Sequence, residues 1–219
     1  EDTRINVKLK SGQETEINAP GPKVTHAQFE QLLSQIRRTT NDDIVIVAGS
    51  VPNSIPSDAY AQIAQITEKT GAQLVVDAEK DLVETVLPYR PLFIKPNKDE
   101  LEVMFNTTVK SDEDVIKYGK EILKKGAQSV IISLGGDGAI YVDQHQSIKA
   151  VNPQGHVVNT VGSGDSTVAG MVAGLSMGLN IDEAFQQAVA SGTATAFSED
   201  LATRDAIENI KSQVTISVL

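Results

Sequence analysis

The start of the chain changes from one hydrophobic pattern to another. Polar and apolar residues alternate with period two from Thr3 to Leu9 and from Glu14 to Ile17, on either side of Ser11-Gly12. This alternation predicts a β-hairpin, which we expect to lie as a flap over one edge of a larger sheet. Further on, the apolar positions follow a helical spacing, and Thr25 with Gln28 matches a capping box at the start of that helix.

Strand-like and helix-like segments then alternate to the end of the chain. Ile44 to Ala48 is a continuous apolar run, which predicts a strand buried on both faces. The alternation predicts an α/β fold with a largely parallel sheet covered by helices on both faces, although segments 138–142 and 146–151 look like an antiparallel pair. The other expected strands span residues 73–77, 92–94, 129–134 and, at an edge, 214–218, and the expected helices span residues 57–70, 79–87, 98–105, 111–125, 164–178, 182–197 and 203–213.

The composition narrows the range of functions. The 219 residues are 40% hydrophobic, enough for one large domain, and contain no cysteine, which excludes disulfides and thiolate metal sites. The net charge of −10 disfavours nucleic-acid binding because it repels phosphate backbones. Apolar runs of membrane-spanning length and a signal peptide are both absent from the sequence, so we expect a cytoplasmic protein with no membrane partner.

The most informative segment is a glycine-rich turn that leads into a helix. In Gly162-Ser163-Gly164-Asp165 the glycines let successive N–H groups point to one spot, and the helix start adds free N–H groups and about +0.5 charge. Such a site suits a transferring phosphoryl group, and Asp165 would accept the proton of the attacking hydroxyl. The same residues also fit a flexible loop with Asp165 as the helix N-cap, and spacing alone does not decide between the two interpretations.

Further segments match one enzyme family in the expected order. Val161 to Ser166 resembles the second signature of the ribokinase-like (PfkB) carbohydrate kinases, Ser133 to Gly138 resembles their ATP-binding turn, and Lys95 to Leu101 resembles their N-x-x-E segment. The resemblance implies a ribokinase-like fold and phosphoryl transfer from ATP with Mg²⁺. It assigns Asp165 as catalytic base, Gly162, Ser163 and Gly164 to an anion hole, and Asn97, Glu100, Ser133, Gly135, Gly136, Gly138 and Thr193 to the nucleotide site, with Glu100 acting on Mg²⁺ through water.

Several of these matches have alternative explanations. The turn Gly135-Gly136-Asp137-Gly138 is also a strong hairpin signal. Asn97 and Glu100 have capping-box spacing and would start helix 98–105 without a ligand. A Rossmann dehydrogenase is disfavoured because Gly162-Ser163-Gly164 is followed by Asp165 and lies late in the chain. A non-catalytic sugar- or nucleotide-sensing module with the same fold stays an alternative.

Three residues outside the nucleotide segments are candidates for substrate binding. Thr3 to Val7 resembles the strand that contacts the sugar phosphate in the phosphofructokinase and tagatose-6-phosphate kinase branch of the family. Arg4 suits a phosphate because its planar group makes two parallel hydrogen bonds, and Asn6 would face the same side of the strand. Ser50 lies in a turn similar to the family's G-S-x-P turn. The alternatives are a surface arginine and an ordinary strand-to-helix loop.

Within this branch the resemblance is strongest to bacterial 1-phosphofructokinases, which implies transfer to the 6-hydroxyl of fructose 1-phosphate. Tagatose-6-phosphate kinase and 6-phosphofructokinase are the nearest alternatives. Residues 1–22 would be a remnant of a β lid with the substrate-contacting strand, and residues 23–219 the nucleotide-binding and catalytic domain. Members of the family carry roughly 80–90 residues before the first of these segments. We therefore expect this chain to correspond to the C-terminal portion of such a protein, to bind nucleotide weakly and to be a poor kinase.

The remaining expectations concern ions and partners. The resemblance implies a full-length homodimer formed through the β lid, and it admits a K⁺ ion held by backbone carbonyls near the anion-hole loop. The three histidines, His26, His145 and His156, are scattered along the sequence and predict no metal site.

Overall fold

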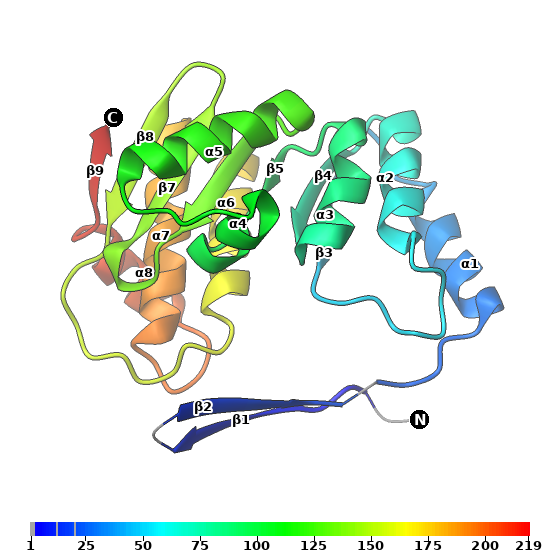
Figure 1. Cartoon of the computed structure of the whole chain (residues 1–219), viewed down its shortest axis with the longest axis horizontal. Helices are drawn as coiled ribbons and strands as arrows, with labels where there is room; N and C mark the ends of the chain where they lie inside the picture. The colour runs from blue at the N-terminus through cyan, green and yellow to red at the C-terminus, as the bar shows by residue number, and fades with distance from the viewer. Residues whose placement is uncertain (1–2, 12, 20) are drawn as a thin grey trace.

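Seven strands of the described residues form one mixed sheet. The computed structural model describes residues 3–11, 13–19 and 21–219. The strands follow one another across the sheet in chain order; those from β3 to β6 pair in parallel and those from β6 to β9 pair antiparallel (Figure 1). They are β3 (Ile44–Ala48), β4 (Gln73–Asp77), β5 (Phe93–Ile94), β6 (Ser129–Ser133), β7 (Ala139–Asp143), β8 (Ser147–Val151) and β9 (Thr215–Val218).

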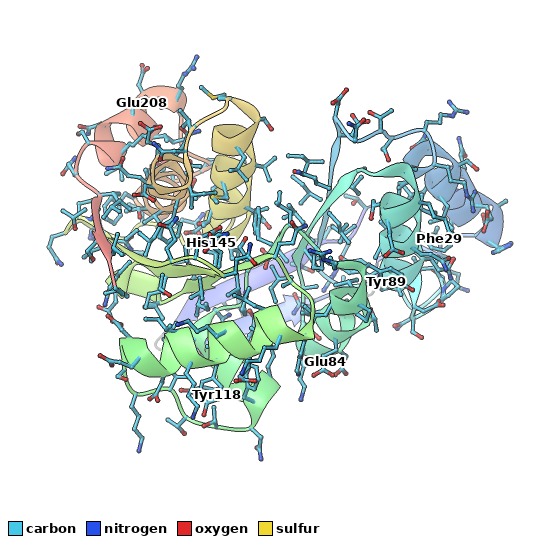
Figure 2. The ribbon with its side chains drawn as sticks, turned by 90° about the horizontal axis from the view of Figure 1, so that it is seen from above. Phe29, Glu84, Tyr89, Tyr118, His145 and Glu208 are labelled. Atoms are coloured by element: carbon cyan, nitrogen blue, oxygen red, sulfur yellow. The ribbon has the colours of Figure 1, made fainter. Side chains whose placement is uncertain are left out.

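Helices lie on both faces of this sheet. Figure 2 shows α5, which carries Tyr118, on one side of the sheet and α8, which carries Glu208, on the other. The α-helices are α1 (His26–Ile36), α2 (Ala59–Thr70), α3 (Lys80–Val86), α4 (Lys98–Phe105), α5 (Asp112–Lys125), α6 (Ser163–Ser176), α7 (Ile181–Ala196) and α8 (Arg204–Lys211), and two short 3₁₀ turns are η1 (Leu87–Tyr89) and η2 (Gly135–Asp137). The expected α/β class, with a mostly parallel sheet between two layers of helices, is confirmed.

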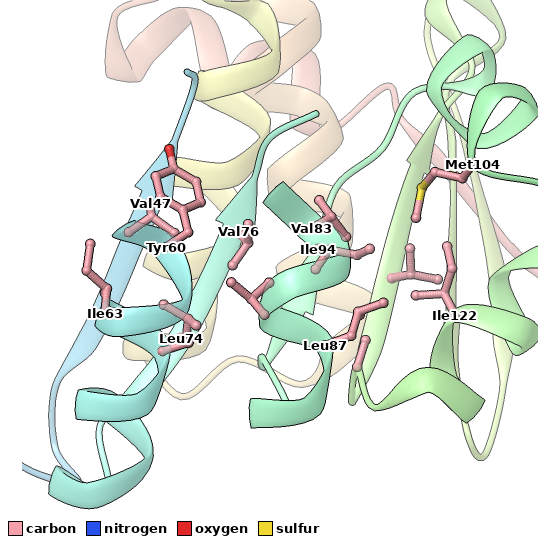
Figure 3. Close-up of a cluster of buried hydrophobic side chains, with 14 of the residues drawn as sticks. Val47, Tyr60, Ile63, Leu74, Val76, Val83, Leu87, Ile94, Met104 and Ile122 are labelled. Atoms are coloured by element: carbon pink, nitrogen blue, oxygen red, sulfur yellow. The ribbon is translucent and has the colours of Figure 1, made fainter. Parts of the chain in front are cut away.

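Period-two alternation along the strands divides the interior into two hydrophobic cores. Val76 and Ile94 face the core shared with α1 to α5, whereas their chain neighbours Val75 and Phe93 face the core under α6 and α7. Figure 3 shows part of the first core, where Val76 and Ile94 lie close to Val83 of α3. Burying each large apolar side chain contributes about 1.5–3 kcal/mol, so both layers of helices are held firmly to the sheet.

Strand β3 departs from its predicted burial. The strand itself is confirmed, but it is not buried on both faces, because Val47 packs in the first core while Ile46 is 44% exposed on the opposite side. In the described sheet β3 is one of the two edge strands, and the second core includes Val75 of β4 but reaches β3 only at the partly buried Ile44. The prediction was wrong because an apolar run does not show how far a layer of helices extends.

The first strands form a hairpin separate from the main sheet. β1 (Asn6–Ser11) and β2 (Gln13–Asn18) pair antiparallel with Val7 opposite Ile17, as the alternation predicted, and Gly12 of the expected turn lies outside the described residues. The hairpin shares no ladder with the main sheet among the described strands. In Figure 1 it runs beneath the sheet, on the side where β3 ends. The expected flap is therefore present, but it lies below strand ends rather than along an edge strand.

Two glycines bring α6 and α7 into close contact. A Cβ atom added to Gly170 would lie 2.9 Å from Ala188 Cα, and one added to Gly174 would lie 2.9 Å from Ala184 Cα. Larger residues would push the helices apart, so these glycines pack the middle and end of α6 against the middle and start of α7, which leaves the start of α6 beside the end of α7. This arrangement positions the glycine-rich turn before α6.

The other expected strands and helices are present with slightly different ends, and the capping box of Thr25 and Gln28 at α1 is confirmed. No helix in residues 3–11, 13–19 and 21–219 is both long enough and apolar enough to cross a membrane.

Candidate active site

A cavity of about 500 Å³ lies between the end of β6 and the helices α6 and α7. Pockets that bind small molecules have volumes of about 300–1,000 Å³, so a nucleotide fits. One wall is η2 with the segment after β8, and the other is the first turn of α6 with α7. The cavity brings together most of the residues assigned to the nucleotide and the anion hole, namely Asn97, Ser133, Gly135, Gly136, Gly138, Ser163, Gly164 and Thr193.

Asp165 lies in the first turn of α6 and does not cap it. The N-cap residue is Gly162, with φ of 79° in the left-handed region, and no side chain caps this helix. The Ser163 N–H donates to Thr160 O, whereas the N–H groups of Gly164 and Asp165 have no acceptor within the helix. The Asp165 side chain is exposed. The N-cap interpretation of Asp165 is therefore wrong, and two backbone N–H groups point out of the helix start beside its carboxylate.

A buried ion pair lies beside this turn. Lys95 Nζ is 3.2 Å from Asp77 Oδ2, with the side chains 7% and 18% exposed. A Cβ atom added to Gly164 would lie 3.4 Å from Lys95 Nζ, so the ammonium group is next to the start of α6. Burial raises the pKa of Asp77, the charge and hydrogen bond of Lys95 lower it, and the negative charge of Asp165 raises it further. One cation and two carboxylates therefore meet at this end of the cavity.

The glycine turn after β6 is both a hairpin turn and a wall of the cavity. It connects β6 to β7, which pair antiparallel, as the hairpin explanation predicted. Gly138 has φ of 93°, and a Cβ atom there would overlap the carbonyl oxygen of Ala150, so only glycine fits. A Cβ atom on Gly135 or Gly136 would meet no atom within 4 Å, so these two residues border open space.

Thr193 lies on α7, across the cavity from η2. Its side chain is 6% exposed, and its hydroxyl donates to Asn152 Oδ1 at 2.9 Å. Asn152, which follows β8, donates in turn from Nδ2 to Gly135 O at 3.0 Å. The Thr193 side chain thus lines the cavity, but its hydroxyl proton is already donated to Asn152.

Asn97 and Glu100 form a capping box at the start of α4. The Asn97 N–H donates to Glu100 Oε2 at 2.7 Å, and the Glu100 N–H donates to Asn97 Oδ1 at 2.8 Å. The capping-box explanation is therefore confirmed. Asn97 lines both the cavity and a neighbouring hollow between the start of α3 and α4, whereas Glu100 lines the hollow but not the cavity. A role for Glu100 at a metal ion stays a prediction, carried by the carboxylate oxygen that the box does not use.

Arg4 and Ser50 meet at the end of β3. Arg4 Nη1 donates to Ser50 Oγ, which joins the hairpin segment to the main domain. Arg4 precedes β1 rather than lying within it, whereas Asn6 is the first residue of that strand. Arg4, Asn6 and Ser50 are all exposed. The structure brings Arg4 and Ser50 together. Among the contacts of the described residues, none joins Asn6 to either of them.

The Ser50 turn is held next to Asp77. The Gly49 N–H donates to Asp77 O at 2.9 Å, and the Tyr60 hydroxyl donates to Gly49 O at 3.0 Å. Burial, and then the charge of Asp77, raises the pKa of Tyr60 to about 12, so this hydroxyl keeps its proton at neutral pH. The Ser50 turn is thus bonded to the backbone of Asp77, and the negative charge of Asp165 acts on the carboxyl group of the same residue.

No group of three or more His, Asp or Glu side chains within the described part of the chain is placed to hold a metal ion. His26, His145 (labelled in Figure 2) and His156 are exposed and lie on separate elements. Mg²⁺ bound with a nucleotide usually keeps several waters and uses one or two carboxylates plus phosphate oxygens. Glu100 beside the cavity fits that kind of site.

Sequence reasoning missed Lys95, Asp77 and Asn152 as site residues. The first two had a usable signal, because polar residues directly after buried parallel strands gather at the edge where α/β sheets bind ligands. Asp77 ends β4, and Lys95 directly follows β5. Asn152 had no such signal, because its importance depends on a contact with Thr193, 41 residues later.

Comparison with known proteins gives a consistent result. Residues 1–206 match the model of the pfkB family carbohydrate kinases. The 1-phosphofructokinase of Bacillus subtilis is 42% identical over 218 residues, which cover 100% of this chain and 72% of the relative. The D-tagatose-1-phosphate kinase of Bacillus licheniformis is 34% identical, with 99% of this chain and 72% of the relative covered. A crystal structure of a candidate phosphofructokinase from Staphylococcus aureus is 82% identical with a TM-score of 0.91, covering 100% of this chain and 72% of that one.

The glycine-lined cavity, the N–H groups at the start of α6 and the α/β fold define a ribokinase-like phosphotransferase. The chain belongs to the pfkB family carbohydrate kinases. It is therefore an enzyme of the sugar-phosphate kinase class, for which ATP and a divalent metal ion are the implied co-substrate and cofactor.

Proposed function

We propose that this kinase transfers the γ-phosphoryl group of ATP to the 6-hydroxyl of fructose 1-phosphate, giving fructose 1,6-bisphosphate. The observation that carries the proposal is the position of Asp165. Its exposed carboxylate lies in the first turn of α6 with two N–H groups that have no acceptor in the helix, it acts electrostatically on Asp77, and the preceding Gly164 lies next to the Lys95 ammonium. The 42% identity to the 1-phosphofructokinase of Bacillus subtilis supports this substrate.

Asp165 is the proposed general base. Its carboxylate takes the proton of the 6-hydroxyl as the new O–P bond forms, while the bond between the γ-phosphorus and the bridging oxygen breaks and ADP leaves. The N–H groups of Gly164 and Asp165 stabilise the charge on the transferring phosphoryl oxygens. Gly162 and Ser163 place these N–H groups. The first supplies the left-handed turn, and the second fixes it through a hydrogen bond from Ser163 Oγ to Gly192 O at 2.8 Å.

Lys95 supplies the fixed positive charge of this site. Because the ammonium is buried and paired with Asp77, it does not need to be ordered when the nucleotide binds. Mg²⁺ is the proposed divalent ion and supplies further neutralisation of the phosphate charge when bound. We propose that Glu100 orients one of its water ligands through the oxygen left outside the capping box.

Arg4, Asn6 and Ser50 are the proposed contacts of the sugar phosphate. Arg4 and Ser50 present a guanidinium and a hydroxyl side by side at the end of β3, a pair suited to phosphate oxygens. In this proposal residues 1–22 contribute the sugar side and residues 23–219 contribute the nucleotide side. A phosphorylated tagatose is the second candidate substrate, because a D-tagatose-1-phosphate kinase is 34% identical to this chain.

The hairpin is the proposed dimer contact. Its side chains Ile5, Val7, Leu9 and Ile17 are all more than 40% exposed, which leaves an apolar surface for a second hairpin to cover. Sedimentation velocity is expected to show a dimer that Val7→Lys converts to a monomer. A monomer at all concentrations for the unchanged chain would contradict this contact.

The substrate proposal is tested by ATP turnover on a panel of fructose 1-phosphate, fructose 6-phosphate, tagatose 1-phosphate and tagatose 6-phosphate. The highest kcat/KM is expected with fructose 1-phosphate, and repeating the assay in KCl and NaCl measures any K⁺ requirement. A higher kcat/KM with a tagatose phosphate would replace the substrate. Binding of ATP and sugar phosphate without transfer would instead favour the sensing module.

A further inference from the structure

One asparagine ties the two walls of the nucleotide cavity together. Asn152 Nδ2 donates to Gly135 O at 3.0 Å and lies 3.5 Å from Gly136 O, while its Oδ1 accepts from Thr193 Oγ1 at 2.9 Å. Both ends of the amide are thus used, one by η2 and the other by α7. A side chain with a donor and an acceptor at fixed separation is required for this link.

The glycine turn has few other attachments of its own. Its backbone hydrogen bonds are internal, from Leu134 N to Gly138 O at 2.8 Å and from Gly138 N to Gly135 O at 3.2 Å. Gly135 and Gly136 border open space, since a Cβ atom on either would meet nothing within 4 Å. The Asn152 amide therefore holds the part of the turn that faces the cavity.

This part of the turn is the one that a nucleotide would contact. The N–H groups of Gly135 and Gly136 open the 3₁₀ turn and so have no acceptor within it. Their distance from the start of α6, across the cavity, decides whether both sets of N–H groups can reach one nucleotide. The distance is fixed through Asn152 and Thr193, because α7 also packs closely on α6.

The role of Thr193 changes as a result. A hydroxyl has one proton to donate, and the Thr193 hydroxyl donates it to Asn152 Oδ1. Since the side chain is only 6% exposed, it is held in that orientation. Thr193 is therefore a support for Asn152 and not a hydrogen-bond donor to the nucleotide.

We propose that Asn152 is a positioning residue for ATP, which holds the glycine turn at a fixed separation from α7, and that Thr193 acts on ATP affinity through Asn152. The inference rests on the proposed function, because it takes ATP as the ligand of this cavity. In this proposal Asn152 contacts both η2 and α7, and it acts on ATP binding without contacting the nucleotide itself.

A double-mutant cycle on Mg·ATP affinity tests the proposal. Calorimetric titration of the 219-residue chain is carried out for the unchanged protein, Asn152→Ala, Thr193→Val and the double variant. Each single change is expected to raise the Kd about fivefold, because a lost hydrogen bond is worth about 1 kcal/mol and a tenfold change is about 1.4 kcal/mol. The double variant is expected to be no weaker than either single variant, since both remove one link.

Two further variants separate positioning from general loss of structure. Thr193→Ser keeps the hydroxyl and is expected to retain the affinity of the unchanged protein. Gln144→Ala lies in the turn at the opposite end of β8, where its side chain contacts His145, and is expected to change neither Kd nor Tm. Hydrogen exchange at the Gly138 N–H, which donates to Gly135 O, is expected to quicken in Asn152→Ala and Thr193→Val but not in the two control variants.

The outcomes are distinct. Additive effects of Asn152→Ala and Thr193→Val would mean that Thr193 meets the nucleotide independently, and would overturn the proposal. Unchanged affinity in both single variants, or affinity lost only together with a large fall in Tm, would also overturn it. If the unchanged chain binds no ATP, the proposed function fails and the inference fails with it; if that chain binds ATP and the cycle is additive, only the inference fails.

Discussion

The nucleotide side and the sugar side of the candidate site are built in different ways. The nucleotide cavity is enclosed by β6, β8, α6 and α7, and its polar contacts join segments far apart in the chain, as Asn152 does between Gly135 and Thr193. The sugar side is an exposed hairpin and a turn, joined through Arg4 and Ser50. The cavity is thus ordered by the folding of the core itself, whereas the sugar side is ordered by few exposed contacts. Mutations should reveal this difference.

The largest effect is expected for Asp165, the proposed base, which would act between the nucleotide and the sugar phosphate. Asp165→Asn is expected to lower kcat by about 10²–10⁴, the usual contribution of a general base, while the Kd of ATP and the KM of the sugar phosphate stay nearly constant. The matched control is Asp205→Asn, an exposed Asp in the first turn of α8, which loses the same helix-dipole contact without any effect on turnover. Steady-state kinetics with calorimetry measures both, and retained turnover in Asp165→Asn would rule out the base assignment.

The next comparison sets one glycine of each side against the other. Gly138 and Gly49 both have positive φ, of 93° and 79°, but a Cβ atom at Gly138 would overlap Ala150 O while one at Gly49 meets nothing within 4 Å. We expect Gly49→Ala to lower the free energy of unfolding by about 1–2 kcal/mol from backbone strain alone. Gly138→Ala is expected to lower it by about 3–4 kcal/mol, because the clash adds to the strain.

Urea denaturation of the two alanine variants provides the measurement. Equal losses at Gly138 and Gly49 would show that the turn after β6 is no more firmly packed than the turn after β3. The contrast between an enclosed and an open side would then fail.

A smaller effect is expected from Arg4. Arg4→Ala should raise the KM of the sugar phosphate about 10–100-fold, because hydrogen bonds to charged groups are worth about 1.5–3 kcal/mol. The Kd of ATP should not change, since Arg4 lies outside the nucleotide cavity. Arg38→Ala, an exposed arginine after α1, removes the same charge and is the control. A parallel loss of ATP affinity in Arg4→Ala would show that the two sides are not independent.

The smallest expected effect is a pH dependence carried by Asp77. Burial raises the pKa of Asp77 above its unfolded value despite Lys95, so the folded protein binds this proton more tightly than the unfolded chain. The stability from Asp77 is therefore full below about pH 4 and is lost as the pH rises through the raised pKa.

The quantity to measure is the unfolding free energy of the unchanged protein minus that of Asp77→Asn between pH 4 and 7. It is expected to fall as the pH rises. A difference that grows with pH would mean that the attraction of Lys95 outweighs burial, and the pKa of Asp77 would then be lowered.

Much of the fold could be predicted from local patterns. Period-two and helical spacings located the strands and helices, and the capping boxes at Thr25 and Asn97 fixed where α1 and α4 begin. The burial of β3 was not predictable in this way, because the exposure of Ile46 depends on where α6 and α7 lie in space. Local patterns predict which residues tend to be buried, but they do not predict which helices pack against a given strand.

Only part of the candidate site could be predicted, because local patterns show motifs made of consecutive residues but not contacts between separate elements. Glycine turns such as Gly162 to Gly164 carry their chemistry in consecutive residues, so their motif is visible in the sequence. The Lys95–Asp77 ion pair and the Asn152 contacts join residues from separate elements, and only folding brings them within reach. The sequence left Asp165 as either a helix N-cap or a catalytic base. The structure excludes the N-cap, because Gly162 is the N-cap residue of α6.

By itself the sequence determined the class of fold, the order of its elements and the positions of the glycine turns that we propose contact phosphate, because backbone conformation and hydrophobic periodicity are local properties. Only the tertiary structure decided which face of β3 stays open, that Lys95 is buried beside Gly164, and that the Thr193 hydroxyl donates to Asn152. These features depend on distances between distant segments, which packing of the two cores sets and no local pattern encodes.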